Sequence, residues 1–78
     1  MINKLSIEYI GDYERLGYKL NENFSYLFNL KDVLEKPYNY IYGYFEKDRL
    51  VGFIHIVLLV DEADIINIVV DDFYRRKG

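Results

Sequence analysis

Three stretches rich in β-branched and aromatic residues fill the second half of the chain, at residues 38–45, 50–60 and 63–70. These residue types favour the pleated, half-buried surface of a β-strand. Short connections separate the stretches, the charged residues 46–49 and then the Asp61-Glu62 pair. A parallel crossover needs a much longer connection, so the pattern predicts three strands paired antiparallel as a meander.

The beginning of the chain shows a simple alternation of apolar and polar side chains. It covers residues 4–10, where Leu5, Ile7 and Tyr9 supply the apolar positions. A period of two predicts a half-buried strand, here an edge strand of the sheet. Asp12 follows, and its carboxylate is suited to cap the first free N–H groups of a helix.

Two helices are predicted between this strand and the meander. Apolar positions recur at helical spacing in residues 13–23, where Gly17 costs about 1 kcal/mol relative to alanine. A glycine at this position indicates either a weak helix or a close packing contact. Asn29 is placed to cap a second, short helix that Pro37 ends. The connection at residues 24–28 is strongly aromatic, which fits a loop that plugs the core.

These elements predict an α+β fold of order β-α-α-β-β-β. A hydrophobic content of 51% with 29% charged residues is typical of a chain that folds, although 78 residues are close to the lower limit for one hydrophobic core. There is no cysteine, which excludes disulfides and cysteine-based zinc sites. No apolar run approaches the length of a membrane helix and no secretory core follows the first residues, so we expect a cytoplasmic location.

The net charge of −3 argues against general nucleic-acid binding, which usually relies on a basic face. The chain has one basic cluster, at its C-terminal end, in the run Arg75-Arg76-Lys77-Gly78. It follows the apolar run 65–70 after a short acidic turn. A strand, a turn and a basic segment with glycine can direct backbone N–H groups at a phosphate.

The run from residue 61 to residue 78 resembles the acetyl-CoA motif of the GNAT acetyltransferase superfamily. In that motif an apolar strand and a turn lead into Arg/Gln-x-x-Gly-x-Gly/Ala, and residues 75–78 match the first four positions. The Asp-Glu-Ala turn at residues 61–63 and the Asn-Ile-Val-Val-Asp strand end at residues 67–71 are most similar to ribosomal-protein-alanine (RimI-like) acetyltransferases. Asp72 departs from the proline that is frequent there, and no Pro-Trp-like substrate-loop signature occurs between the helices.

The resemblance implies acetyl-CoA as the acetyl donor and an amine as the acceptor, with a protein N-terminal α-amine as one candidate. It also gives the two helices and the aromatic connection at residues 24–28 an alternative role, the lining of the acceptor groove. It implies that the pantetheine arm pairs with the backbone of Ile68, Val69 and Val70. It further implies a pyrophosphate site at Arg75, Arg76, Lys77 and Gly78. With one histidine and no cysteine, the chain is expected to hold no metal. The family's catalytic base and acid belong to elements beyond residue 78, so the catalytic residues stay unknown. Residues 1–78 then form a partial domain, the N-terminal half of the GNAT fold, which we expect to be inactive alone.

A second hypothesis is a non-catalytic half-domain that acts in folding or oligomerisation. The strand at residues 63–70 has no predicted neighbour on its far side, and an uncovered apolar edge is a template for pairing with another copy. Other candidates have simpler interpretations. Glu62, Asp71 and Asp72 fit solvated or capping carboxylates, and His55, the one histidine, fits a half-buried packing residue.

Overall fold

The computed structural model describes residues 1–75. Its sheet has four antiparallel strands in the order β1-β2-β3-β4, formed by Ile2–Lys4, Asn39–Glu46, Arg49–Leu58 and Ala63–Val70. The helical elements are the 3₁₀ turn η1 (Ile7–Tyr9) and the helices α1 (Ile10–Gly17), α2 (Phe24–Leu27), α3 (Leu30–Glu35) and α4 (Asp72–Arg75). The predicted α+β class and the antiparallel meander are confirmed, and β4 has the predicted bounds.

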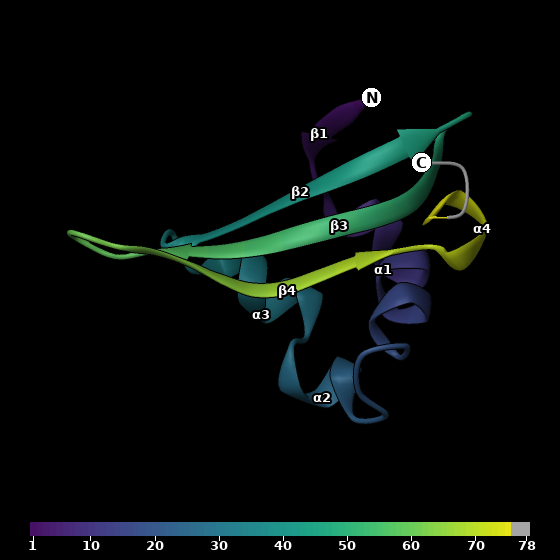
Figure 1. Ribbon diagram of the computed structural model, residues 1–78. Coiled ribbons are helices and arrows are strands. Elements are labelled where there is room, and N and C mark those ends of the chain that lie inside the picture. The colour runs from purple at the N-terminus through teal and green to yellow at the C-terminus, as the bar shows by residue number, and fades with distance from the viewer. Residues whose placement is uncertain (76–78) are drawn as a thin grey trace.

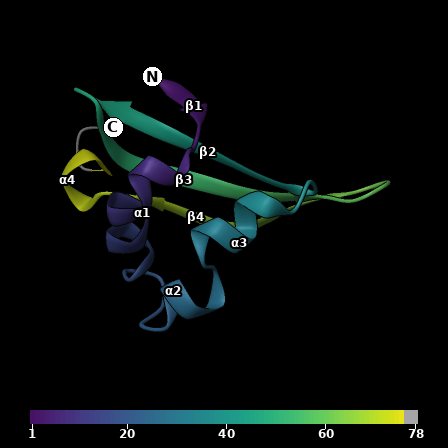
Figure 2. The same ribbon diagram turned by 180° about the vertical axis from the view of Figure 1, so that it is seen from behind.

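The sheet has one face covered by helices and one open face. α1, α2 and α3 all lie on the same side of the sheet, as the two opposite views show (Figures 1 and 2). β4 forms one edge of the sheet, and α4 follows it directly at the end where α1 packs (Figure 1). This arrangement brings the end of β4 next to α1, although more than fifty residues separate them in sequence.

The hydrophobic core lies between the helices and the covered face. Its buried members come from every layer and are Leu5, Tyr13, Leu16, Phe24, Leu30, Val33, Ile41, Leu50, Phe53 and Val69. The Tyr13 ring lies 5.0 Å from the Phe24 ring and 4.8 Å from the Phe53 ring, centroid to centroid. Tyr13 also donates a hydrogen bond from its hydroxyl to the Phe28 carbonyl, at 2.8 Å. Aromatic side chains therefore join α1, α2 and β3.

The aromatic connection at residues 24–28 packs into the core through two of its rings. Residues 24–27 form α2, a single turn that the sequence did not predict. Phe24 is fully buried in the core and Phe28 packs against it. Tyr26, in contrast, is 87% exposed on the outer side of the turn.

The predicted first strand at residues 4–10 is wrong. The strand that forms is Ile2–Lys4, and the chain then turns through η1 into α1. Leu5 is buried, whereas Ile7, which strand alternation would bury as well, is 48% exposed. The residues that contact the core continue as Leu5, the partly buried Tyr9, Tyr13 and Leu16, at spacings of three and four, so the helical period decides this segment.

The first helix also begins earlier and ends sooner than predicted. α1 starts at Ile10, so Asp12 lies inside its first turn and does not cap it. Its carboxylate instead contacts Arg15 one turn along, at 3.3 Å. The second helix follows the prediction more closely, because the side chain of Asn29 accepts a hydrogen bond from the Asp32 N–H at 3.3 Å.

The β2–β3 hairpin fixes the register of the sheet. Its two loop residues, Lys47 and Asp48, have φ angles of 52° and 64°. Positive φ at both central positions is the geometry whose twist matches antiparallel strands. The pairing places Gly43 opposite Phe53, and Phe53 opposite Val69 on β4.

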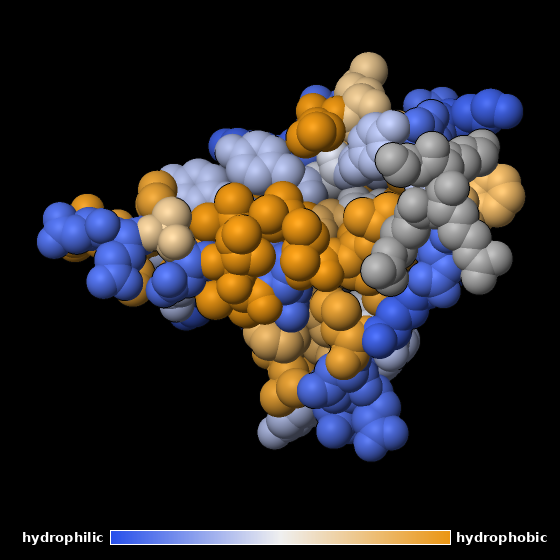
Figure 3. Space-filling view, in the orientation of Figure 1, coloured by the Kyte–Doolittle hydropathy of each residue, from blue (hydrophilic) through white to orange (hydrophobic). Residues whose placement is uncertain are grey.

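The open face of the sheet is apolar. Tyr42, Ile54 and Ile68 are aligned across β2, β3 and β4 on this face. Hydrophobic side chains gather over the middle of the sheet in the surface view (Figure 3). Ile65 and Ile68 of β4 are 62% and 59% exposed.

Candidate functional site at the edge of β4

The outer edge of β4 presents free backbone groups. Asp71 donates its N–H to the Val51 carbonyl of β3, at 2.7 Å. Because the backbone of an antiparallel strand alternates in direction, Val69 also directs its N–H and C=O toward β3. The N–H and C=O groups of Ile68 and Val70 consequently point to the outer edge. Among residues 1–75 no strand pairs with that edge.

A β-bulge precedes these free groups. Asn67 pairs with His55, and Ile65 pairs with the next residue of β3, Ile56, so Ile66 is left without a partner in the ladder. A bulge bends its strand and increases the local twist. It therefore turns the segment from Asn67 to Val70 relative to the first half of β4.

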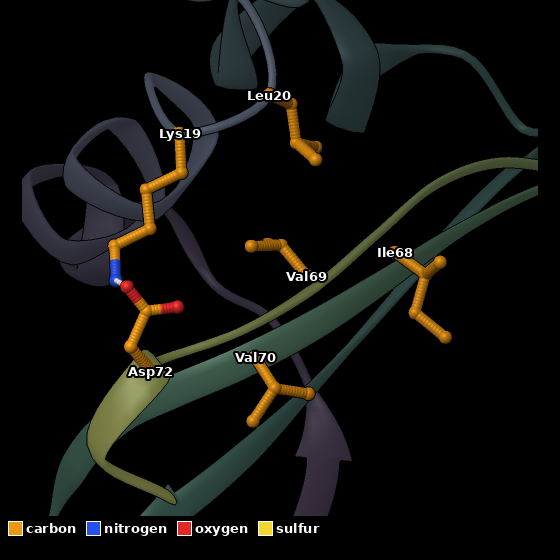
Figure 4. Close-up of a pocket in the computed structure, with 6 residues that line it drawn as sticks. All are labelled: Lys19, Leu20, Ile68, Val69, Val70 and Asp72. Carbon is orange, nitrogen blue, oxygen red and sulfur yellow. Dashed lines mark ion pairs between the residues drawn. The ribbon is translucent and has the colours of Figure 1, made fainter. Parts of the chain in front are cut away.

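A hollow of about 740 Å³ lies along this part of β4. Its walls are the strand end and the segment that follows α1, and its lining residues are Lys19, Leu20, Ile68, Val69, Val70 and Asp72 (Figure 4). The volume is within the range of pockets that hold cofactors and small molecules. The three strand residues that the sequence singled out thus line one hollow, together with two residues from the segment that follows α1.

Arg15 anchors the far end of this site. Its guanidinium contacts Asp71 Oδ2 at 2.8 Å and the Leu50 carbonyl at 3.2 Å, besides Asp12. Asp71 also accepts a hydrogen bond from the Phe73 N–H at 3.0 Å. That backbone hydrogen bond and Arg15 hold the pKa of the Asp71 carboxyl below its usual 3.8. Asp71 is therefore a structural carboxylate that fixes the turn from β4 into α4.

Most of the other residues that the sequence analysis considered are paired, exposed or outside the described residues. Asp72 forms an ion pair with Lys19, at 3.5 Å, and Glu62 is exposed in the β3–β4 turn. Arg75 is the last residue of α4, and Arg76, Lys77 and Gly78 lie outside the described residues. The geometry of residues 1–75 does not assign a catalytic base or acid.

His55 belongs to a buried polar cluster on the covered face. It is 3% exposed, and its Nε2 lies 2.8 Å from Asn39 Oδ1. Because the Asn39 amide nitrogen donates to the Val33 carbonyl, Oδ1 faces the ring and Nε2 is the donor. His55 Nδ1 and Asn67 Nδ2 have no hydrogen-bond partner among the described residues. His55 is thus a core histidine, and burial lowers its pKa below 6.5.

This environment predicts a pH dependence of stability. The unfolded chain protonates its histidine near the usual pKa of 6.5, whereas the folded chain does so only at lower pH. The free energy of unfolding should therefore fall as the pH drops below about 6.5, until the folded pKa is passed. Urea unfolding at a series of pH values would measure this slope. His55→Gln should remove it, and an unchanged slope in that variant would contradict the assignment.

The sequence did not identify Arg15, Lys19 and Leu20 as parts of this site. The spacing of Arg15 and Lys19 could have pointed to them, because residues four apart lie on the same face of a helix. Two carboxylates, Asp71 and Asp72, occur side by side in the distant turn after β4. Only the packing of α1 against the end of β4 brings the two pairs together.

Two negative findings concern the described residues. No helix within residues 1–75 combines the length and apolar character needed to cross a membrane. In the same part of the chain, no cluster of three or more His, Cys, Asp or Glu side chains is arranged to hold a metal ion.

Comparison with known proteins gives one match. Neither the curated proteins nor the solved structures include a significant match to this chain. The family model described as the acetyltransferase (GNAT) family matches residues 2–78. This match covers nearly the whole chain, including β4 and the hollow beside it. The chain therefore belongs to the GNAT acetyltransferase family.

Proposed function

We propose that this chain binds acetyl-CoA along the outer edge of β4 and takes part in acetyl transfer to an amine. The observation that carries the proposal is the hollow of about 740 Å³ beside the free backbone groups of Ile68 and Val70. An extended chain with amide groups, such as the pantetheine arm, can pair with such an edge as an added strand would. The basic residues 75–78 follow β4 and α4 in the sequence, and the resemblance assigns the cofactor's phosphates to them.

Each predicted site residue has a specific part in this proposal. Ile68 and Val70 would exchange hydrogen bonds with the pantetheine amides. Val69 directs its backbone toward β3 and its side chain into the core, so it would hold the strand in place and line the hollow. Arg75, Arg76, Lys77 and Gly78 would contact the pyrophosphate.

The acceptor is proposed from the sequence resemblance alone. The run from residue 61 to residue 76 is similar to ribosomal-protein-alanine acetyltransferases, which favours a protein N-terminal α-amine. Acetyl transfer to an amine needs a base for the ammonium and an acid for the leaving thiolate. The one carboxylate that lines the hollow, Asp72, is paired with Lys19, so residues 1–75 do not assign these two roles.

An amide-resolved NMR titration of the ¹⁵N-labelled chain tests cofactor binding even when it is weak. Acetyl-CoA should shift the amide resonances around Ile68 and Val70 most strongly, because those N–H groups would gain hydrogen bonds. Adenosine 3′,5′-bisphosphate, which lacks the pantetheine arm, is the matched ligand and should leave the Ile68 and Val70 amides nearly unshifted. If millimolar acetyl-CoA leaves these two amides in place, the proposed function is wrong.

A second candidate function is self-association through β4. It is favoured by the exposure of Ile65 and Ile68 beside an edge that no strand pairs within the described residues. Apolar side chains next to free backbone groups are a template for a further strand. Light scattering on the same sample should then give a multiple of the 9.4 kDa monomer mass, and the mass of a monomer at all concentrations would exclude this candidate.

A further inference from the structure

Two basic side chains, one in α1 and one in the segment that follows it, meet two carboxylates directly after β4. Arg15 pairs with Asp71, and Lys19 pairs with Asp72. The two pairs differ in their geometry. The Arg15–Asp71 contact is 2.8 Å long and belongs to a network that includes the Leu50 carbonyl. The Lys19–Asp72 contact is 3.5 Å long, and the side chains are 35% and 68% exposed.

The weaker pair lies at the hollow beside β4. Lys19 extends from the segment after α1 toward α4, and its ammonium group meets Asp72 at one end of the hollow (Figure 4). The free backbone groups of Ile68 and Val70 follow the adjacent wall. A ligand that pairs with the strand would therefore pass within reach of the flexible lysine side chain.

The charges around the hollow favour a move of the Lys19 ammonium from Asp72 to a bound phosphate. Adjacent carboxylates at Asp71 and Asp72 would repel an anionic ligand at this end of the hollow. Arg15 pairs with Asp71, and Lys19 pairs with Asp72. An exposed ion pair contributes about 1 kcal/mol or less, so Lys19 can leave Asp72 at small cost. The pyrophosphate of acetyl-CoA carries two negative charges, one more than a carboxylate, and would attract the ammonium more strongly.

We propose that Lys19 is an exchangeable cation of the cofactor site. In the free chain it neutralises Asp72, and in the complex its ammonium moves to a phosphate oxygen of acetyl-CoA. This inference rests on the proposed function and adds a residue that lies far from the acetyl-CoA motif in sequence. Arg15, which is held by several contacts, keeps its place in both states.

The test compares dissociation constants, obtained from NMR titrations, for ligands with and without phosphates. Lys19→Gln should weaken acetyl-CoA binding by about threefold to tenfold and leave pantetheine binding unchanged. Asp72→Asn should strengthen acetyl-CoA binding by about twofold to threefold, because it removes the competing carboxylate. Lys31→Gln is the matched control, since Lys31 is exposed on α3 and does not line the hollow.

The outcomes separate this inference from the proposed function. If acetyl-CoA shifts the β4 amides of the unmodified chain but Lys19→Gln binds it with an unchanged dissociation constant, the inference is wrong and the proposed function stands. An equal loss for acetyl-CoA and pantetheine would indicate a purely structural lysine and would also overturn the inference. If acetyl-CoA does not bind the unmodified chain at all, both fail together.

Discussion

Replacing Gly17 by alanine is expected to destabilise the protein by about 1–3 kcal/mol, although alanine is the better helix former. A Cβ atom built on Gly17 would lie 2.0 Å from the Phe24 ring, inside van der Waals contact. Phe24 is fully buried and packs against Tyr13, so its ring has no free space to move into. Overpacking should therefore outweigh the gain in helix propensity of about 1 kcal/mol. Urea unfolding followed by circular dichroism would measure the difference.

Gly11 provides a matched control within the same helix. A Cβ atom there has nothing within 4 Å, so Gly11→Ala should stabilise the chain by up to about 1 kcal/mol. The pair of variants separates packing from propensity, because both replace a glycine of α1 by alanine. In a Phe24→Leu background the cost of Gly17→Ala should shrink, since leucine leaves space at the contact. Equal effects at Gly11 and Gly17 would show that the Phe24 contact does not limit this site.

Gly17 also illustrates what the sequence could reveal about the fold. The pattern flagged the residue as either a weak point or a close contact, but it could not choose, because the contacting ring comes from the separate element α2. The meander was predicted well for the opposite reason. Each of its strands pairs with its neighbour in sequence, and the turn residues lie between them.

The N-terminal segment shows where short patterns mislead. Apolar and polar side chains alternate over seven residues, which fits a strand, yet Leu5, Tyr9 and Tyr13 also fit a helical period. The structure follows the helical period, because these three side chains contact the core. Periodicity over so few residues cannot distinguish the two, and burial against the sheet decides the outcome.

Only one side of the candidate site could be predicted from the sequence. The β4 side of the hollow follows a continuous run and could be read directly. The α1 side could not, since Arg15 and Asp71 are 56 residues apart and meet only after α1 has packed on β3 and β4. Which backbone groups of β4 face outward also depended on the observed register.

Replacing Arg15 by methionine is expected to cost about 2 kcal/mol of stability, the second large effect. Methionine keeps much of the apolar stem but loses the hydrogen bonds to Asp71 and to the Leu50 carbonyl. A double-mutant cycle with Asp71→Asn should give a coupling energy of about 1 kcal/mol, because the two side chains share one interaction. Asp12→Asn is the control and should cost less than about 0.5 kcal/mol, since its contact with Arg15 is a longer pair along the helix surface.

The same pair predicts an acid-dependent loss of stability. The pKa of Asp71 in the folded chain lies below 3.8, chiefly through the hydrogen bond from the Phe73 N–H and then through Arg15. Well above pH 3.8 the carboxyl is ionised in both the folded and the unfolded chain, so its stabilising effect is complete. As the pH falls further, the unfolded chain binds the proton first and stability is lost until the folded pKa is passed. Asp71→Asn should reduce this loss, and Arg15→Met should reduce it in part because the Phe73 hydrogen bond remains. An unaltered acid transition in both variants would show that Asp71 does not stabilise the junction between β4 and α4 on which the site depends.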